Sequence, residues 1–356
     1  MICPLTRRCS SEYEAYAGKN RICRIYYREV VLMTDFLMLQ RIHRMIKELP
    51  RPRLLFRKGV TAEGFFRPYM SFSEYTKARI FGSFDEITPV TVRFASMLGS
   101  PGTADTARNI KGMNVKFRSG DGDYDMICHS IPVFFIDEAE KFFDMADAFT
   151  KRYSFDGINT RRFWEFIVEN PEAAHCALRL FSKEGLSGSY IGMKWYSADT
   201  CVWENAAGGR YLVRYRWLPV VEDREGSRGS DKALDRLSAE FMAGFDSDRA
   251  VDDLEAAVKS GAFPQYELYV QMRGYDGENI AEITKRTVLW DEETVPAVAA
   301  GIMKLTSVPD GALSRRDTTS FVPENTVEGI AWRGDGLGDI INYMYRVEEL
   351  ERGGLE

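Results

Sequence analysis

The stretch that decides the fold spans residues 92–135. It contains four segments: Val92-Arg93-Phe94, Gly102-Thr103-Ala104-Asp105-Thr106-Ala107-Arg108, Lys111-Gly112-Met113-Asn114-Val115-Lys116-Phe117 and His129-Ser130-Ile131-Pro132-Val133-Phe134-Phe135. The first and third place a cation between apolar neighbours, which is typical of a strand with one face on a core, and an arginine on the other face can meet a carboxylate. The segment between them is rich in turn-forming residues, and the apolar run at residues 131–136 is too short for a membrane span. The stretch therefore predicts a β-rich core with buried aromatic side chains.

The composition of the chain excludes several classes of protein. The chain has 356 residues, of which 45% are hydrophobic, and this is ample for a sizeable core in one large domain or two. A net charge of −6 with a pI near 5.5 argues against nucleic acid or an anionic membrane as the main partner, since either selects a basic surface. Six cysteines without CxxC spacing are too few for a disulfide scaffold at this length, so we expect reduced thiols in a cytoplasmic protein.

The beginning of the chain is poorly patterned. It carries Arg7 and Arg8 but no apolar segment of the ~7–15 residues that a secretory signal needs. No run in the sequence approaches the ~18 apolar residues of a transmembrane helix. We expect residues 1–33 to be a flexible lead-in and residues 34–356 to form one domain without a transmembrane segment.

The remaining patterns alternate between helices and strands. Apolar residues at helical spacing predict helices at residues 34–46, 142–152, 160–180, 234–242 and 251–260, the last of them ending at Gly261. Alternating residues predict a strand at residues 266–272, and a hairpin is expected at residues 201–217 around the turn that contains Gly208 and Gly209. Residues 53–66 indicate an extended stretch, a glycine-bearing turn and the start of an aromatic strand. His43 is expected on the surface and His175 in the core.

Several separated motifs now point to one family. They are Lys58-Gly59 with Gly64-Phe65-Phe66, the run from Asp253-Leu254 to Gly261-Ala262-Phe263-Pro264, and Leu268-Tyr269-Val270-Gln271. Together with the opening stretch they resemble the haem catalases, particularly short catalase-related haemoproteins such as the allene oxide synthases, over residues 35–352. The resemblance implies an α+β fold, in which haem b is buried between an antiparallel β-barrel and the α-helices that surround it.

The resemblance also implies which residue binds the iron. In the family a tyrosine phenolate near the C-terminus is the proximal ligand, and Asp335 followed ten residues later by Tyr345 resembles the family spacing. A phenolate is a hard anionic donor that suits ferric iron, and the metal keeps it deprotonated well below its free pKa of ~10. The alternative is a surface tyrosine in a C-terminal helix.

The same resemblance to the haem catalases implies further contacts with the haem. Arg53, Arg93 and Arg352 match family arginines that bind the haem propionates, for which bidentate guanidinium groups are well suited. Phe134 and Phe142 match the aromatic wall of the distal pocket, although core packing explains each of them equally well.

Four positions depart from the family pattern. Phe56 stands where catalases have the distal histidine, His129 where they have an asparagine, Ala95 where a serine orients the histidine, and Ile341 where an arginine hydrogen-bonds the phenolate. Peroxide dismutation needs a base that moves a proton between the two oxygens, and a phenyl ring cannot do this. We therefore expect efficient catalase activity to be lost. Ile341 removes a donor from the phenolate, which Asn342 or Arg346 could replace.

His129 has two interpretations. An imidazole with a pKa near ~6.5 can act as an acid or base at neutral pH, whereas a core histidine would fill the space left by the asparagine. The sequence predicts a haem enzyme of specialised metabolism that acts on a small organic substrate, by rearranging a hydroperoxide, by dehydration or by oxygenation, with His129 and Phe56 at the reaction site. The alternatives are a non-catalytic haem sensor or carrier and a weak peroxidase that uses His129. A homo-oligomer is expected from the resemblance.

Overall fold

The computed structural model describes residues 36–48, 53–97, 102–149, 160–220, 234–275, 279–309 and 319–353. The predicted lead-in at residues 1–33 lies outside these ranges. Within them, Cys128, Cys176 and Cys201 are free thiols, all of them buried. The expected cytoplasmic location stays a prediction.

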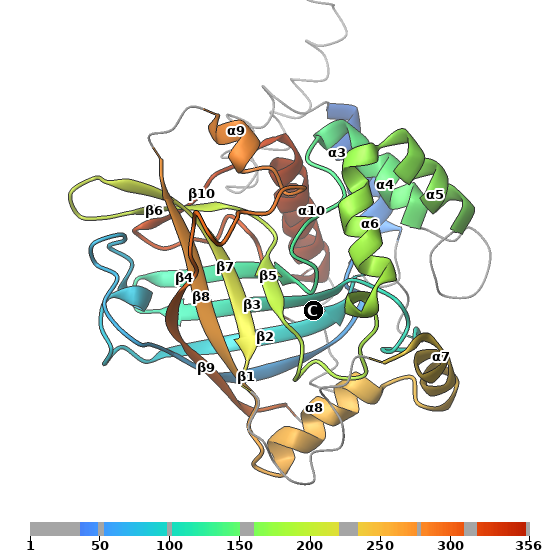
Figure 1. Ribbon diagram of the computed structural model, residues 1–356, viewed down its shortest axis with the longest axis horizontal. Helices are drawn as coiled ribbons and strands as arrows, with labels where there is room; N and C mark the ends of the chain where they lie inside the picture. Colours follow the sequence, from blue (N-terminus) through green and yellow to red (C-terminus); the bar gives the residue numbers. More distant parts are fainter. Residues whose placement is uncertain are drawn as a thin grey trace, which may run out of the picture.

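Eight antiparallel strands close into a barrel (Figure 1), so the predicted fold class is confirmed. Around the barrel they are β7 (Arg210–Pro219), β5 (Trp195–Ser197), β4 (Gly122–His129), β3 (Lys111–Ser119), β2 (Thr88–Ser96), β1 (Lys58–Pro68), β9 (Val298–Ser307) and β8 (Gln265–Gly274), which pairs again with β7. Two short strands, β6 (Cys201–Glu204) and β10 (Ile330–Trp332), extend the sheet from β7. The predicted hairpin is β6–β7, and its turn contains Gly208 at a φ of +81°.

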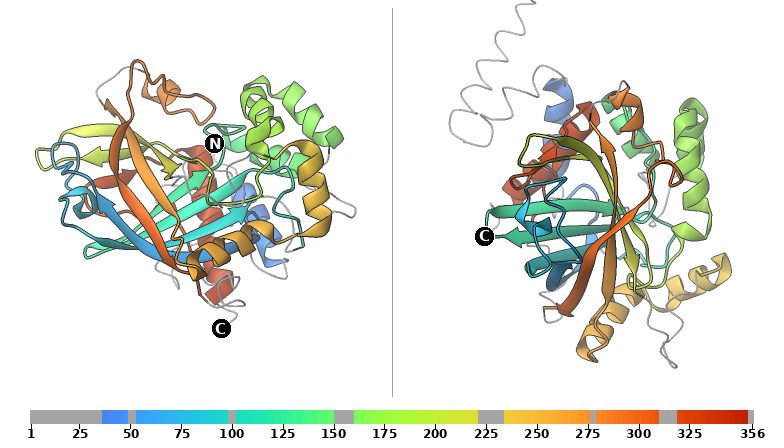
Figure 2. Two further views of the ribbon diagram at one scale, coloured as in Figure 1. Left: turned by 60° about the horizontal axis from the view of Figure 1, so that its bottom comes forward. Right: turned by 60° about the vertical axis from the view of Figure 1, so that its left-hand side comes forward.

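Helices pack around this barrel (Figures 1 and 2). They are α3 (Phe36–Lys47), α4 (Phe142–Phe149), α5 (Thr160–Glu169), α6 (Ala174–Phe181), α7 (Arg236–Phe245), α8 (Arg249–Lys259), α9 (Ile280–Ile283) and α10 (Gly336–Gly353). Short 3₁₀ helices lie at Arg79–Phe81, Ala139–Lys141, Pro171–Ala173 and Lys183–Gly185. Gly261 follows α8 at a φ of +78°, as predicted for a helix end. None of the helices in the described part of the chain is long and apolar enough to cross a membrane.

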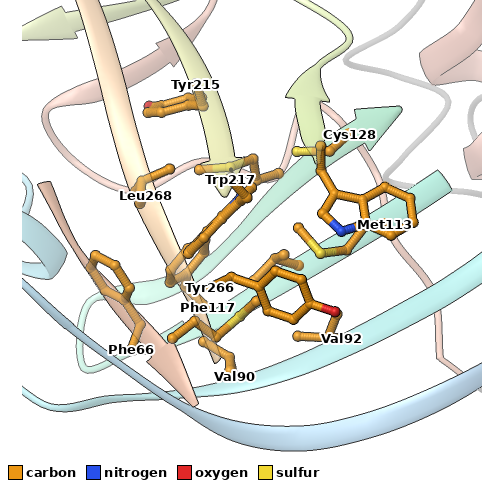
Figure 3. Packing of buried hydrophobic residues seen from close by; sticks show 14 of the residues in the cluster. Phe66, Val90, Val92, Met113, Phe117, Cys128, Tyr215, Trp217, Tyr266 and Leu268 are labelled. Carbon is orange, nitrogen blue, oxygen red and sulfur yellow. Dashed lines mark hydrogen bonds between the residues drawn. The ribbon is translucent and has the colours of Figure 1, made fainter. Parts of the chain in front are cut away.

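The barrel interior is apolar and aromatic, as Figure 3 shows. Alternate residues of each strand point inward, so Val92 of β2, Phe117 of β3 and Trp217 of β7 meet in one buried cluster. The ring centroids of Phe117 and Trp217 are 6.4 Å apart. The sequence prediction of a β-rich core with buried aromatic side chains is therefore confirmed.

The outer face of β2, β3 and β4 is also buried, and this corrects the prediction of half-buried strands. Arg93, Asn114 and His129 alternate with the inward-facing residues and are at most 9% exposed. Their burial follows from α3, α4 and α10, since Ile42, Phe142 and Tyr345 of these helices share one buried cluster with Ala95 of β2. The arginine of this stretch, Arg93, donates to the Phe56 carbonyl oxygen at 2.8 Å. Lys116 of β3 is the residue that meets a carboxylate, with its Nζ 2.6 Å from Oδ1 of Asp125.

Three further expectations were wrong. The helix expected at residues 160–180 is interrupted at Pro171, because proline cannot donate the backbone hydrogen bond that an α-helix needs. No turn interrupts residues 58–66, which all belong to β1, where Gly59 allows close pairing: a Cβ there would lie 2.3 Å from the Phe94 carbonyl oxygen. His175 is exposed rather than buried in the core, and its Nε2 accepts a hydrogen bond from Arg179. A fourth expectation is met only in part, because His43, expected on the surface, keeps 30% of its side chain exposed.

Candidate functional site

The predicted site residues lie where α10 and the segments around β4 cover the outer face of the barrel. One buried apolar cluster contains Phe56, Phe134, Phe142 and Tyr345, and Ile341 packs against it. Phe56 precedes β1, Phe134 follows β4 and Tyr345 lies on α10, so the tertiary structure gathers residues that are distant in sequence. Phe142, at the start of α4, contacts the ring of Phe143.

Three rings stack at the centre of this cluster. The imidazole of His129 stacks with the rings of both Phe56 and Phe134, with centroid distances of 5.8 and 5.6 Å and interplanar angles of 16° and 26°. Among the described residues, the imidazole makes no side-chain hydrogen bond or ion pair. His129 is therefore held mainly by apolar packing, unlike a core histidine whose ring nitrogens are bonded to polar partners.

Phe56 is held in a left-handed backbone conformation, with a φ of +56°. For a bulky residue this conformation costs about 1–2 kcal/mol and persists only when its surroundings require it. The amide of Phe56 donates to the Met97 carbonyl oxygen at 2.9 Å, and its own carbonyl oxygen accepts from Nη2 of Arg93 at 2.8 Å. Gly112 makes room for the ring, since a Cβ at this position would lie 2.6 Å from Cε1 of Phe56. Gly112 is also the residue that pairs with His129 across β3 and β4.

The electrostatic surroundings make His129 a weak base. Burial, and secondarily the positive charge of Arg286, lower its pKa to about 4, well below the value near 6.5 that the sequence interpretation assumed. Arg286 is itself buried and keeps its charge, because three carboxylates surround its guanidinium group: those of Asp137, Asp199 and Asp335. His129 is therefore neutral at pH 7.

Tyr345 is buried in α10, with 3% of its surface exposed, so it is not a surface tyrosine. Burial, together with the nearby Glu348 carboxylate, raises the pKa of its phenol to about 12, while Arg53, a hydrogen bond from Asn114 and Arg93 oppose this shift. The phenol is therefore protonated at pH 7 without a metal, and an iron ion would have to displace this proton.

The three predicted arginines lie around Tyr345 and the C-terminal part of α10. Nη2 of Arg53 and Nη1 of Arg352 both donate to the Thr319 carbonyl oxygen, at 3.1 and 3.3 Å. Arg53 is 1% exposed, and its Nη1 lies 4.0 Å from Oε2 of Glu348. Arg93 of β2 donates to the Phe56 carbonyl oxygen and, like Arg53, opposes the rise in the pKa of Tyr345.

Sequence reasoning missed Asn114, Gly112 and Glu348. Asn114 is the residue whose amide reaches the Tyr345 hydroxyl, whereas Asn342 donates to Glu324 and Arg346 donates to Asn325. The alternation along β3 could have placed Asn114 on the outer face, since it lies two residues from Gly112 and two from Lys116. No local pattern could have identified its contact with α10.

Comparisons with known proteins agree with this arrangement. Residues 11–355 match the family model described as Catalase. The chain is 32% identical to Catalase-2 of Bacillus subtilis over 324 residues, which are 89% of this chain and 46% of that protein. It is 31% identical to the catalase of Methanosarcina barkeri over 89% of this chain and 62% of the relative, and 30% identical to the catalase of Latilactobacillus sakei over 87% and 64%. The chain thus spans about half to two thirds of the length of these relatives.

Haem b with iron is the cofactor that this family uses, so the predicted cofactor is confirmed at the level of the family. The residues of the site fit such a group. A buried phenol is a suitable anionic donor once deprotonated, buried guanidinium groups can neutralise propionates, and the surrounding wall is aromatic.

Proposed function

The chain belongs to the catalase family, and on this premise we propose that it is a haem enzyme that has lost efficient peroxide dismutation and acts on a small organic substrate. The observation that carries the proposal is the stack of Phe56 on His129, which puts an apolar ring where the family base is expected and a neutral imidazole beside it. An organic hydroperoxide is the first candidate substrate, by analogy with the allene oxide synthases.

Tyr345 would bind the iron, and Arg53, Arg93 and Arg352 would neutralise the propionates. Phe134 and Phe142 would form the aromatic wall of the pocket. Ile341, which packs against the same cluster, offers no donor to the phenolate. When bound, haem supplies a redox-active iron that can cleave an O–O bond.

The residues around His129 explain why dismutation is disfavoured. That reaction requires a group that takes a proton from one peroxide oxygen and returns it to the other. Phe56 has no ionisable group, and a pKa of about 4 makes His129 a poor proton acceptor at neutral pH. Phe56 and Phe134 instead stack with the imidazole, whose residue is 9% exposed, so the ring nitrogens of His129 would serve to orient a bound substrate.

A haem-binding protein without turnover is the second candidate. The packing of His129 against two phenyl rings favours it, because a residue that is only 9% exposed offers little surface to a substrate. A weak peroxidase that uses His129 would need the same imidazole as a base and is disfavoured by its low pKa.

The test is an optical titration of the purified holoprotein with hydrogen peroxide and with a fatty-acid hydroperoxide. We expect turnover of the hydroperoxide and slow oxygen release from hydrogen peroxide. The variant Phe56→His should raise oxygen release by about 100-fold, the size of a general-base effect, and Phe56→Leu should not. Oxygen release by the unchanged chain near the diffusional ceiling of ~10⁸ M⁻¹s⁻¹ would refute the loss of dismutation. Spectral binding without turnover of either peroxide would favour the second candidate.

A further inference from the structure

Arg286 binds three carboxylates at once. It follows α9 in the chain and is 7% exposed. Its guanidinium group donates to Oδ1 of Asp137 at 3.2 Å, to Oδ1 of Asp199 at 2.6 Å, and to both carboxylate oxygens of Asp335 at 3.0 Å. A guanidinium group is planar and offers five N–H donors, so one side chain can serve three acceptors in fixed directions. Arg286 therefore joins three segments that are distant in the sequence.

The first of these segments is the wall of the candidate site that contains Phe134. The carbonyl oxygen of Arg286 accepts from the Phe134 amide at 2.8 Å, and the amide of Arg286 donates to Oδ1 of Asp137 at 3.0 Å. Residues 134–137 are thus fastened to Arg286 at both ends. Because Phe134 stacks with His129 at a centroid distance of 5.6 Å, this fastening also bears on the position of the imidazole.

The second segment is the first turn of α10, the helix that carries Tyr345. Oδ1 of Asp335 accepts from the Gly338 amide at 2.7 Å, as the side chain of a helix-capping residue does, while both of its oxygens accept from Arg286. Gly338 leaves room for this contact, since a Cβ there would lie 2.9 Å from Nη2 of Arg286. The start of α10 is therefore shaped around the guanidinium group.

The third segment provides an internal comparison. Asp199 lies in the turn between β5 and β6, so it belongs neither to the Phe134 wall nor to α10. Its side chain is 18% exposed, and those of Asp137 and Asp335 are 21% and 24% exposed. Water can therefore reach all three carboxylates when one of their contacts with the guanidinium group is removed, which favours folded variants.

We propose that Arg286 is a positioning residue, which clamps the Phe134 wall to the first turn of α10 and so fixes the two sides between which the haem would lie. Leu337 and Ile340 of α10 share one buried apolar cluster with Phe134, so wall and helix belong to the same packed unit. The inference rests on the haem site proposed above but not on the loss of peroxide dismutation. It assigns Arg286 no contact with the substrate.

The first test is amide hydrogen exchange, measured by mass spectrometry on the purified holoprotein. Asp335→Asn should speed exchange about tenfold in residues 131–139, although the substitution lies at the start of α10, because one charge-assisted contact of the clamp is lost. An asparagine at this position can still accept from the Gly338 amide, so the helix cap is kept. Asp137→Asn should conversely speed exchange in residues 336–342.

Asp199→Asn is the matched control. It removes the same charge from the same guanidinium group, yet it should speed exchange only near β5 and β6. Circular dichroism and the melting temperature establish that the variants are folded.

The second test is the rate at which haem passes from the holoprotein to an excess of apomyoglobin. Arg286→Met should raise this rate about tenfold, and Asp335→Asn should do so as well, which keeps the test decisive if Arg286→Met does not fold. Arg286→Lys should not restore the slow rate, because an ammonium group keeps the charge but lacks the planar fork. Asp199→Asn should keep the rate of the unchanged chain.

Three results would overturn the proposal. Exchange in residues 131–139 that does not respond to Asp335→Asn would show that wall and helix are not coupled. Faster exchange without faster haem loss would show that Arg286 only stabilises the fold. Full recovery by Arg286→Lys would show that charge suffices without the clamp. Rapid oxygen release from hydrogen peroxide by the unchanged chain is a separate outcome, which would refute the proposed function and leave both measurements unaffected.

Discussion

The ring of Phe56 lies nearly parallel to the imidazole of His129, with centroids 5.8 Å apart and an angle of 16° between the planes. Phe56 precedes the first strand of the barrel, and His129 is the last residue of β4. The contact depends on Gly112, which pairs with His129 and lacks the Cβ that would collide with Phe56. Phe56, Gly112 and His129, which come from different parts of the chain, therefore together form the stacked contact in the candidate site.

Replacing Gly112 with alanine should displace the Phe56 ring. The new Cβ would lie 2.6 Å from Cε1 of Phe56, and overpacking of this kind costs about 1–3 kcal/mol of unfolding free energy. Denaturant unfolding measures the loss, and the double variant Gly112→Ala, Phe56→Leu should recover part of it. Gly102→Ala is the control, because nothing lies within 4 Å of its Cβ position. Additive effects of the two substitutions would contradict the contact.

The burial of His129 predicts a loss of stability in acid. Its folded-state pKa of about 4 is lower than the unfolded value of about 6.5, so the unfolded chain takes up a proton first as the pH falls. The free energy of unfolding is therefore unaffected by His129 above pH 6.5. As the pH falls from 6.5 to 4, protonation of His129 in the unfolded chain lowers the free energy of unfolding by up to about 3 kcal/mol. Unfolding free energies measured across this range should fall less steeply for His129→Leu than for the unchanged chain. An exposed control, His175→Asn, should change the slope much less.

The lowered pKa of Lys111 predicts that the free energy of unfolding depends on pH in alkaline solution. Burial is the main cause that lowers its pKa to about 8, with Asp105 opposing and Lys58 adding to the shift. Between pH 8 and about 10.5 the unfolded chain binds more protons than the folded chain, so this residue makes the unfolding free energy rise with pH by up to about 3 kcal/mol. Lys111→Met should remove this rise, and the surface variant Lys183→Met should keep it. Parallel pH profiles for Lys111→Met and the unchanged chain would show that Lys111 titrates normally.

We expect the phenol of Tyr345 to be required for the chain to retain haem. Because it is the buried phenol close to Arg53 and Arg93, Tyr345→Phe should abolish stoichiometric haem content, measured by the haem absorbance per chain after purification. Tyr343→Phe is the matched control on the same helix and should keep the haem. A Tyr345→Phe protein with full haem content and an unchanged ferric spectrum would refute the assignment of the ligand.

The sequence determined the fold class and the positions around which the site is built. Motifs spread from Lys58 to Gln271 identified the catalase scaffold, and the spacing of Asp335 and Tyr345 selected a tyrosine that proves to be buried. These signals are readable because alternation along a strand and fixed spacing along a helix are local properties.

Only the tertiary structure decided which residues meet. The pKa of His129 near 4 depends on burial and on Arg286, which lies 157 positions away in the sequence. The contact of Asn114 with Tyr345 likewise joins β3 to the C-terminal helix, and the position of Gly112 beneath Phe56 depends on the pairing of β3 with β4. Desolvation and close packing are set by neighbours from the whole chain, so no local pattern in the sequence contains them.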